Sequence, residues 1–223
     1  MIETRILIVG AGGLGSPAAL ALAESGVRTI GICDPDVVDV SNLHRQLLHT
    51  DADIGRKKVD SARDAIARVA PACEVVAFAR PFGEDMLPHF DIVIEGSDSA
   101  ETKFAVSDAC VRAKKPNIIG GALRWSGQLL PWSPDAEDAG CYRCLFEAPP
   151  PPESLTTCQE AGILGPVCGV VGALQAAAAL ALAGHPDPRH APRPGRIYLY
   201  DALRGTLRDV IVKRRPDCKE HWS

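Results

Sequence analysis

The sequence lacks the excess of positive charge that nucleic-acid-binding proteins carry. Its 24 lysines and arginines are outnumbered by 28 aspartates and glutamates, so the formal net charge is −4. The basic residues are scattered along the chain, apart from a short run at positions 213–215. The sequence thus shows no cluster of basic residues that would bind the phosphates of a polynucleotide, and we expect no nucleic-acid partner.

We also expect no secretory leader. Between Met1 and the apolar run at 6–9 there is no charged n-region, no long apolar h-region and no small-residue cleavage site. We therefore expect the protein to be cytoplasmic. In that reducing compartment its eight cysteines are expected to be core thiols, metal ligands or reactive groups rather than disulfides.

Large apolar side chains are scarce in the one long uncharged stretch, residues 163–183. Its length meets the criterion for a membrane span. Its many alanines and glycines, however, give it a weaker transfer energy than a span rich in Leu, Ile or Phe, and we expect no membrane segment. A helix with small side chains on all sides is better explained as buried between a sheet and a neighbouring subunit, which predicts a homodimer.

No internal repeat is visible, and a content of 46% hydrophobic and 23% charged residues is that of an ordinary globular domain. What the chain does contain is an alternation of segments with strand and helix patterns. The expected strands are 5–10, 29–33, 74–78, 91–95 and 117–120, and the expected helices are 14–25, 57–69 and 101–113. Such alternation predicts a parallel sheet covered by helices on both faces.

After residue 121 the pattern changes to longer strand-like pieces at 124–132, 196–200 and 206–212, which indicate an antiparallel extension of the same sheet. We therefore predict a single α/β domain over 1–223 with a Rossmann-like doubly wound sheet. Its nucleotide-binding part is 1–121. The remainder, 122–223, carries the antiparallel strands, a helix and a C-terminal tail stapled by a metal.

A glycine-rich loop joins the first expected strand to the first expected helix. Gly10, Gly12, Gly13 and Gly15 lie in the pattern G-x-G-x-x-G. Glycines allow a tight turn and let phosphate oxygens approach the free N–H groups at a helix N-terminus, where the helix dipole is positive. Asp34 ends the next strand, where a carboxylate can bind ribose hydroxyls. These residues predict nucleotide binding but do not distinguish NAD from ATP.

Two cations and two amides further along the chain favour ATP. Asn42, Arg45 and Gln46 lie close together, and Lys58 follows at the start of a helix. Arg grips phosphate oxygens bidentately, and Lys neutralises charge that develops on a phosphoryl group. Asp98 follows the strand 91–95, so it lies at the sheet edge where ligands collect and where a carboxylate can hold Mg²⁺. Singly, each of these residues could equally be a solvated charge or a helix cap.

The same features occur together in a known family. The chain from residue 6 to its end resembles the ThiF/MoeB/HesA family of adenylating enzymes, bacterial relatives of ubiquitin-activating enzymes, in the glycine loop, Asp34-Pro35-Asp36, Ser41-Asn42-Leu43, Arg45-Gln46, Lys58, Asp98 and Cys141-Tyr142-Arg143-Cys144. The resemblance implies Asp34 on the ribose, Asn42, Arg45 and Lys58 around the phosphates, Gln46 in support of the same pocket and Asp98 on Mg²⁺.

The reaction that the resemblance implies is ATP-dependent adenylation of the C-terminal glycine carboxylate of a ubiquitin-like or sulfur-carrier protein ending in Gly-Gly. An acyl-adenylate and pyrophosphate would form, and a sulfurtransferase is a further expected partner. The chain departs from the family pattern at two points. The family's N-terminal arginine, which enters the partner subunit's ATP site, has no match, and Ser99 replaces an asparagine after Asp98.

The cysteines fall into groups. Cys141 and Cys144 form C-x-x-C, while Cys218 and His221 form C-x-x-H near the end of the chain. Two such knuckles can supply four ligands to a tetrahedral, structural Zn²⁺. The resemblance supports this pairing, although the family's second knuckle is usually C-x-x-C. The open alternatives are reduced thiols beside an unrelated histidine, or a redox C-x-x-C.

Cys158 follows a polar segment that is expected to be mobile, and its thiol could be reactive. In some members of the family the matching cysteine takes part in sulfur transfer, so Cys158 is a candidate catalytic residue. The remaining thiols lie near apolar runs and are expected to be buried and structural: Cys33, Cys73, Cys110 and Cys168.

Two other functions remain open from sequence. An NAD-dependent oxidoreductase would use the glycine loop and Asp34 but leaves Arg45, Lys58 and the knuckles unexplained. A non-catalytic binding subunit that has kept the fold is favoured by the missing N-terminal arginine. Intact Arg45, Lys58 and Asp98 argue against it.

Overall fold

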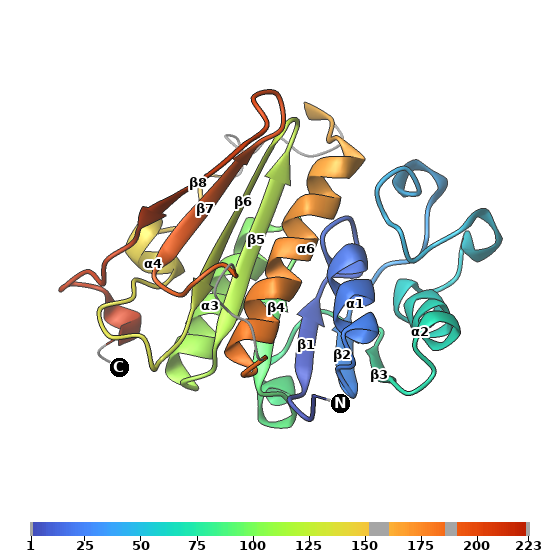
Figure 1. Cartoon of the computed structure of the whole chain (residues 1–223), viewed down its shortest axis with the longest axis horizontal. Coiled ribbons are helices and arrows are strands. Elements are labelled where there is room, and N and C mark those ends of the chain that lie inside the picture. Colours follow the sequence, from blue (N-terminus) through green and yellow to red (C-terminus); the bar gives the residue numbers. More distant parts are fainter. Residues whose placement is uncertain (1, 152–160, 186–190, 222–223) are drawn as a thin grey trace.

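The chain is built around one continuous sheet, seen in a computed structural model that describes residues 2–151, 161–185 and 191–221. The strands lie in the order β3-β2-β1-β4-β5-β6-β7-β8 (Figure 1). They are β1 (Ile6–Val9), β2 (Thr29–Cys33), β3 (Glu74–Phe78), β4 (Ile92–Glu95), β5 (Asn117–Leu123), β6 (Ser126–Trp132), β7 (Arg196–Asp201) and β8 (Thr206–Ile211). This arrangement confirms the predicted mixed sheet.

The first five strands are parallel. Helices connect them, because parallel neighbours need a crossover. The long helices are α1 (Gly15–Glu24), α2 (Lys58–Val69), α3 (Ala100–Arg112) and α6 (Gly165–Leu182), and the short ones are η1 (Val40–Asn42), η2 (Asp51–Asp53), η3 (Glu84–His89), α4 (Tyr142–Leu145) and η5 (Lys219–His221). The strand order reverses between β1 and β4, which is the switch point where ligands of such sheets bind.

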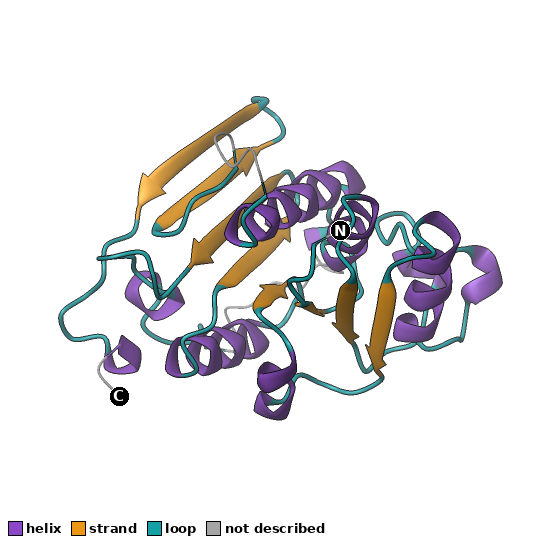
Figure 2. Cartoon of the chain, turned by 60° about the horizontal axis from the view of Figure 1, so that its bottom comes forward, coloured by secondary structure: helices purple, strands orange, loops and turns teal. Residues whose placement is uncertain are grey.

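Helices cover both faces of the sheet (Figure 2). In β1 the side chains alternate between two cores: Ile6 and Ile8 pack on the side of α1, α2 and α6, and Leu7 and Val9 pack on the side of α3. All four are buried. This period-two pattern with both faces apolar is the signature of a strand inside a doubly covered sheet.

The antiparallel extension begins at a tight hairpin. Strand β5 continues to Leu123, and β6 starts at Ser126, opposite it. The predicted strand 124–132 was therefore wrong at its start, because Arg124 lies in the turn with a φ of 54°. A positive φ is typical of a two-residue hairpin turn, and arginine gives no sequence signal for it. The predicted boundary at 121 falls inside β5, so the sheet continues across it.

Helix α6 lies on the sheet beside α1, as expected for the uncharged stretch. It is long and apolar enough to cross a membrane, with mean hydropathy 1.7. In this fold, however, it packs on the sheet, and 44% of its residues are buried. A Cβ on Gly172 would lie 2.4 Å from the carbonyl oxygen of Leu14, so the small residues allow the two helices to approach closely. This packing explains the composition of α6 without a membrane.

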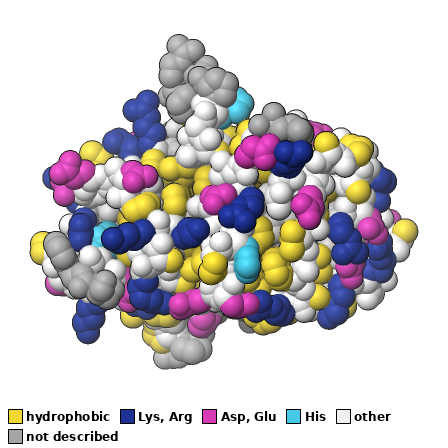
Figure 3. Space-filling view, turned by 90° about the horizontal axis from the view of Figure 1, so that it is seen from below, with side chains coloured by type: hydrophobic (Ala, Val, Ile, Leu, Met, Phe, Trp, Pro, Cys, Tyr) yellow, Lys and Arg dark blue, Asp and Glu magenta, His cyan; other side chains and the backbone are white. Residues whose placement is uncertain are grey.

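The surface seen from below in Figure 3 carries lysines and arginines interspersed with acidic and apolar side chains.

Candidate functional site

The glycine loop follows β1 at the carboxyl edge of the sheet and leads into α1. Gly10 has a φ of 95°, and a Cβ on Gly15 would lie only 1.8 Å from the carbonyl oxygen of Gly10. A side chain at either position would therefore distort the turn. Among the described residues, no side chain caps α1 at Leu14, and its first turn has no acidic residue. The N-terminus of α1 is thus available to an anion such as phosphate.

Asp34 is fixed against this loop. Its Oδ2 accepts the Ala11 N–H at 2.8 Å, and its Oδ1 accepts the Asp36 N–H at 2.9 Å. The carboxylate is nearly buried at the end of β2. Its two backbone bonds hold it beside the switch point, which is the position the sequence predicted for a ribose ligand.

Arg45, Asn42 and Gln46 lie over the glycine loop. The Arg45 Nη2 donates to Asn42 Oδ1 at 2.7 Å. A Cβ on Gly13 would lie 3.5 Å from Arg45 Cδ, and one on Gly12 would lie 3.6 Å from Gln46 Nε2. Gln46 is buried, yet its Oε1 has no hydrogen-bond partner among the described residues. A buried amide oxygen without a partner is costly, so this group fits a site completed by a ligand.

Lys58 begins α2 and reaches the same edge. Its Nζ donates to Asp36 Oδ2 at 2.8 Å and lies 3.9 Å from Asp34 Oδ1. The side chain is only 7% exposed. The acid pair therefore holds the ammonium beside the glycine loop, where it can neutralise a phosphate.

Asp98 lies in the turn between β4 and α3, again at the carboxyl edge. The turn contacts the glycine loop, because a Cβ on Gly10 would lie 3.1 Å from Ser97 N. Asp98 is exposed and is not the cap of α3. That cap is Ser99, whose Oγ accepts the Thr102 N–H at 3.1 Å. The exposed Asp98 carboxylate is therefore not used as the helix cap.

Sequence reasoning missed a buried histidine under the glycine loop. His49 Nε2 donates to the carbonyl oxygen of Ala11 at 3.0 Å, and its Nδ1 bonds with Ser61 Oγ at 2.8 Å. Burial lowers the pKa of His49, so the ring is neutral near pH 7. It braces the loop against α2. A histidine after two leucines gives no signal for this role, which depends on contacts with Ala11 and Ser61, distant in the sequence.

The four predicted metal ligands form one cluster at the other end of the molecule. Cys141 Sγ lies 3.8 Å from Cys144 Sγ and 3.7 Å from Cys218 Sγ, and Cys144 Sγ lies 3.8 Å from His221 Nε2. All four ligand atoms lie within 4.8 Å of one another. Tetrahedral Zn²⁺ with Zn–S bonds of about 2.3 Å would separate its sulfurs by about 3.8 Å. The geometry therefore fits zinc.

The environment of the cluster also suits a cation. Burial raises the pKa of the Cys141 and Cys218 thiols, and the charge of the neighbouring Cys144 thiolate adds to both rises. Clustered thiols of this kind deprotonate when a dication compensates their charge. Burial lowers the pKa of His221, which keeps its imidazole neutral, as a ligand must be. The Arg215 N–H donates to Cys144 Sγ at 3.4 Å and supports that sulfur.

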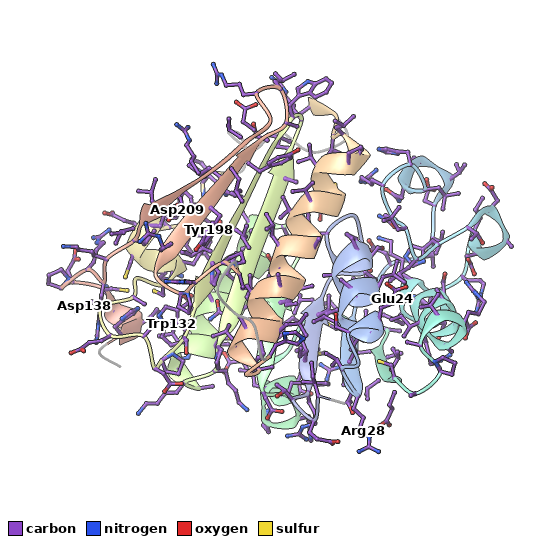
Figure 4. The ribbon with its side chains drawn as sticks, viewed as in Figure 1. Glu24, Arg28, Trp132, Asp138, Tyr198 and Asp209 are labelled. Atoms are coloured by element: carbon purple, nitrogen blue, oxygen red, sulfur yellow. The ribbon has the colours of Figure 1, made fainter. Side chains whose placement is uncertain are left out.

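Side chains dock the C-terminal tail on α3 and β6. The Arg112 Nη1 donates to Glu220 Oε2 at 3.0 Å, and Trp132 packs edge-on against His221 with ring centroids 6.1 Å apart. Trp132 is labelled at this end of the sheet in Figure 4, away from α1 and α2. The cluster is therefore remote from the glycine loop. Its position suits a structural role in attaching the C-terminal tail.

A comparison with models of known protein families identifies the family of this chain. The model described as "ThiF family" matches residues 1–220.

The chain belongs to the ThiF family.

Curated relatives of this ThiF-family chain carry the name "Adenylyltransferase and sulfurtransferase MOCS3". The protein from Bos taurus is 44% identical over 223 residues, covering 98% of this chain and 48% of the relative. The one from Culex quinquefasciatus is 41% identical over 221 residues, covering 97% and 49%. The chain thus spans about half the length of the curated relatives it matches.

Solved structures of E. coli MccB share the ThiF-type fold. The structure titled "E. coli MccB + ATP" has a TM-score of 0.83 at 21% identity and covers 100% of this chain and 68% of that one. The complex titled "MccB + MccA-N7isoASN" has a TM-score of 0.82 at 22% identity, covering 98% and 67%. At these identities the likeness establishes the fold.

The cysteines outside the cluster of this ThiF-family chain differ in their burial. Cys33, Cys110 and Cys168 are buried, as predicted. Cys73 was predicted to be buried as well, but it lies in the turn before β3 and is half-buried, because the apolar run begins only after it. Cys158 lies outside the described residues, and its catalytic role stays a prediction.

Proposed function

We propose that this ThiF-family chain adenylates the C-terminal glycine carboxylate of a small ubiquitin-like or sulfur-carrier protein with ATP. The observation that carries the proposal is the convergence of an uncapped helix N-terminus, a fixed acid and two cations, Arg45 and Lys58, at one sheet edge. Hydride transfer uses no such pair of cations, whereas a triphosphate does. The name of the curated relatives supports the same activity.

The proposed roles follow from the positions. The glycine loop and α1 would receive the phosphates, and Asp34 the ribose hydroxyls. Arg45 would grip phosphate oxygens, with Asn42 and Gln46 completing the pocket. Lys58 would stabilise negative charge during phosphoryl transfer. Asp98 would hold Mg²⁺, which supplies charge neutralisation when it is bound.

The reaction needs no side-chain nucleophile. A carboxylate oxygen of the carrier's terminal glycine attacks the α-phosphorus, and the bond from that phosphorus to the bridging oxygen breaks. Pyrophosphate leaves with that electron pair, and the carrier is left as an acyl-adenylate. The residues of the site act by positioning and by charge stabilisation.

The nucleotide preference gives the first test. Calorimetry on the isolated protein should show ATP with Mg²⁺ binding about tenfold or more tightly than NAD, because the cations suit a triphosphate. Arg45→Ala should remove most of this preference. Arg204→Ala is a control, since Arg204 is exposed and forms a local ion pair with Asp201 in the β7–β8 hairpin. Tighter binding of NAD than of ATP would overturn the adenylation proposal.

We also infer a homodimer formed through α6. None of its residues is charged, and its outer side presents Val170, Ala173 and Ala177 at helical spacing, with Ala173 exposed. A helix side with no polar group is suited to a second copy of the chain.

Sedimentation should therefore show a dimer that Ala173→Glu converts to a monomer, because the new carboxylate would be buried without a partner. The control is Leu203→Glu at the tip of the β7–β8 hairpin, where Leu203 is 70% exposed. A wild-type protein that is monomeric at micromolar concentration would refute the interface.

The remaining assignments complete the proposal. The cluster of Cys141, Cys144, Cys218 and His221 would hold a structural Zn²⁺. The carrier would end in Gly-Gly, and the reaction would take place in the cytoplasm. A sulfurtransferase would act on the activated product, with Cys158 as a candidate sulfur nucleophile. The identity of the carrier could be found among small Gly-Gly proteins that copurify with the chain.

A further inference from the structure

A buried ion pair that the reaction does not use lies directly behind the Asp98 turn. Glu95, the last residue of β4, is 0% exposed, and Lys103 on α3 is 12% exposed. The Lys103 Nζ donates to Glu95 Oε2 at 2.7 Å, and also to the carbonyl oxygens of Ser97 at 2.6 Å and Gly120 at 2.7 Å. All three donors of the ammonium are therefore used.

The same pair engages every polar group of Ser97, the residue before Asp98. Glu95 Oε1 accepts the Ser97 N–H at 2.8 Å and also the Ser97 hydroxyl, while the Ser97 carbonyl accepts from Lys103. Ser97 in turn contacts the glycine loop at Gly10. The pair thus sets the position of the Asp98 turn relative to the phosphate loop.

A further contact ties the pair to the sheet. Gln175 of α6 donates through Nε2 to the backbone oxygen of Glu95 at 2.7 Å and to that of Ile118 at 3.1 Å. The end of β4 is therefore linked to β5 by Gln175 of α6 and by Lys103 of α3. The turn that carries Asp98 follows this linked end of β4, and Lys103 also binds its backbone at Ser97.

Stability alone does not account for this arrangement. Burial raises the pKa of Glu95, and the Lys103 ammonium opposes that rise. Removing two charges from water is costly, and well-packed apolar residues often stabilise a core equally well. What an apolar pair cannot supply is the set of directed bonds that Lys103 and Glu95 make to Ser97.

We propose that Glu95 and Lys103 are positioning residues that fix the Asp98 turn at the cation site of the bound nucleotide. The inference rests on the proposed function, since it takes Asp98 as the magnesium carboxylate. Residues that orient a metal ligand without touching the metal commonly change metal affinity by about 10- to 100-fold when they are lost. Lys103→Met should therefore weaken the cation without removing any ligand of the nucleotide itself.

The test uses Mn²⁺ as a spectroscopic probe together with a non-hydrolysable ATP analogue and the full chain. Electron paramagnetic resonance titrations should show Mn²⁺ binding to the complex, weakened in Asp98→Asn and weakened by about tenfold in Lys103→Met. Nucleotide affinity measured in EDTA should be unchanged in Lys103→Met. The control is Lys115→Met, because Lys115 also donates to a backbone carbonyl, that of Phe90 at 2.6 Å, but lies away from the site.

The possible results distinguish the positioning role of Glu95 and Lys103 from the assignment of Asp98 as the cation ligand. If Asp98→Asn weakens Mn²⁺ and Lys103→Met leaves it at the wild-type affinity, the positioning role is refuted and the proposed function stands. If Asp98→Asn also leaves Mn²⁺ affinity unchanged, the assigned cation site is wrong, and the inference is overturned with it. Should Lys103→Met fail to fold, the double variant Glu95→Gln/Lys103→Met removes both charges, and the same tenfold loss is expected of it.

Discussion

Replacing Lys58 with alanine should slow carrier-dependent exchange of pyrophosphate into ATP by about a hundredfold or more, the scale expected when a charge partner of a transition state is lost. The Lys58 ammonium is nearly buried and held beside the glycine loop by Asp36 and Asp34. Its removal leaves that acid pair without a cation next to the phosphates. Asp98→Ala should show a loss of similar size.

The matched control is the neighbouring lysine. The Lys57 Nζ donates to the carbonyl oxygen of Pro35 at 3.3 Å, and the residue is exposed. Lys57→Ala should therefore leave the exchange rate close to that of the wild type. An equal loss in both variants would mean that general positive charge, rather than the position of Lys58, is what the reaction requires.

Cys158→Ala tests the division between activation and sulfur transfer. The exchange reaction needs only geometry and charge, so this variant should retain it. Any defect should appear in a later step, in which the acyl-adenylate becomes a thioester, an acyl disulfide or a thiocarboxylate, because only such a step uses a sulfur nucleophile. Exchange that is lost in Cys158→Ala but kept in Lys58→Ala would reverse the proposed roles.

Cys218→Ser should release a zinc ion that copurifies with the wild-type protein at about one per chain, since a closed four-ligand site does not survive the loss of a thiolate. Cys218 supplies the sulfur that lies 3.7 Å from Cys141 Sγ. Elemental analysis measures the metal directly. Limited proteolysis should then show earlier cleavage in the tail around residues 213–221, because it would be held without the metal, by contacts such as the Arg112–Glu220 pair and the backbone bond from Arg214 N to Asp138 O.

Cys73→Ser is the control for this experiment. Cys73 is half-buried and lies outside the cluster, so its substitution should keep the zinc and leave the tail protected. Freshly purified wild-type protein without zinc would refute the assignment of the cluster as a zinc site.

Local patterns made the parallel half of the fold predictable. The run Ile6–Val9, the glycine loop and Asp34 follow one another within a single βαβ unit, so their relation depends on short stretches of chain. The hairpin turn at Arg124 was missed because a positive φ is imposed there by strand pairing and not by the residue. Cys73 was assigned to the core because it lies beside the apolar run of β3, but it precedes the strand and is half-buried.

Contacts between distant segments could not be predicted in the same way. His49 touches Ala11, a residue 38 positions earlier, and Lys103 binds both the end of β4 and Gly120 of β5. Glu95 gave a partial signal, as a charged residue at the end of an apolar strand, but its partner depends on where α3 crosses the sheet. Such networks form only after the sheet has brought its strand ends together.

The class of sheet, the glycine loop with its acid and the four metal-ligand candidates could be predicted, because each depends on periodicity or on short spacing. Only the packing of distant segments brings the Sγ atoms of Cys141 and Cys218 to 3.7 Å from each other, across a separation of 77 positions in the sequence. It also decided that Lys58 is held by an acid pair and that the Asp98 turn is fixed by a buried ion pair. The physical reason is the same in each case: burial and distance between side chains are set by how strands and helices pack, which local sequence patterns do not specify.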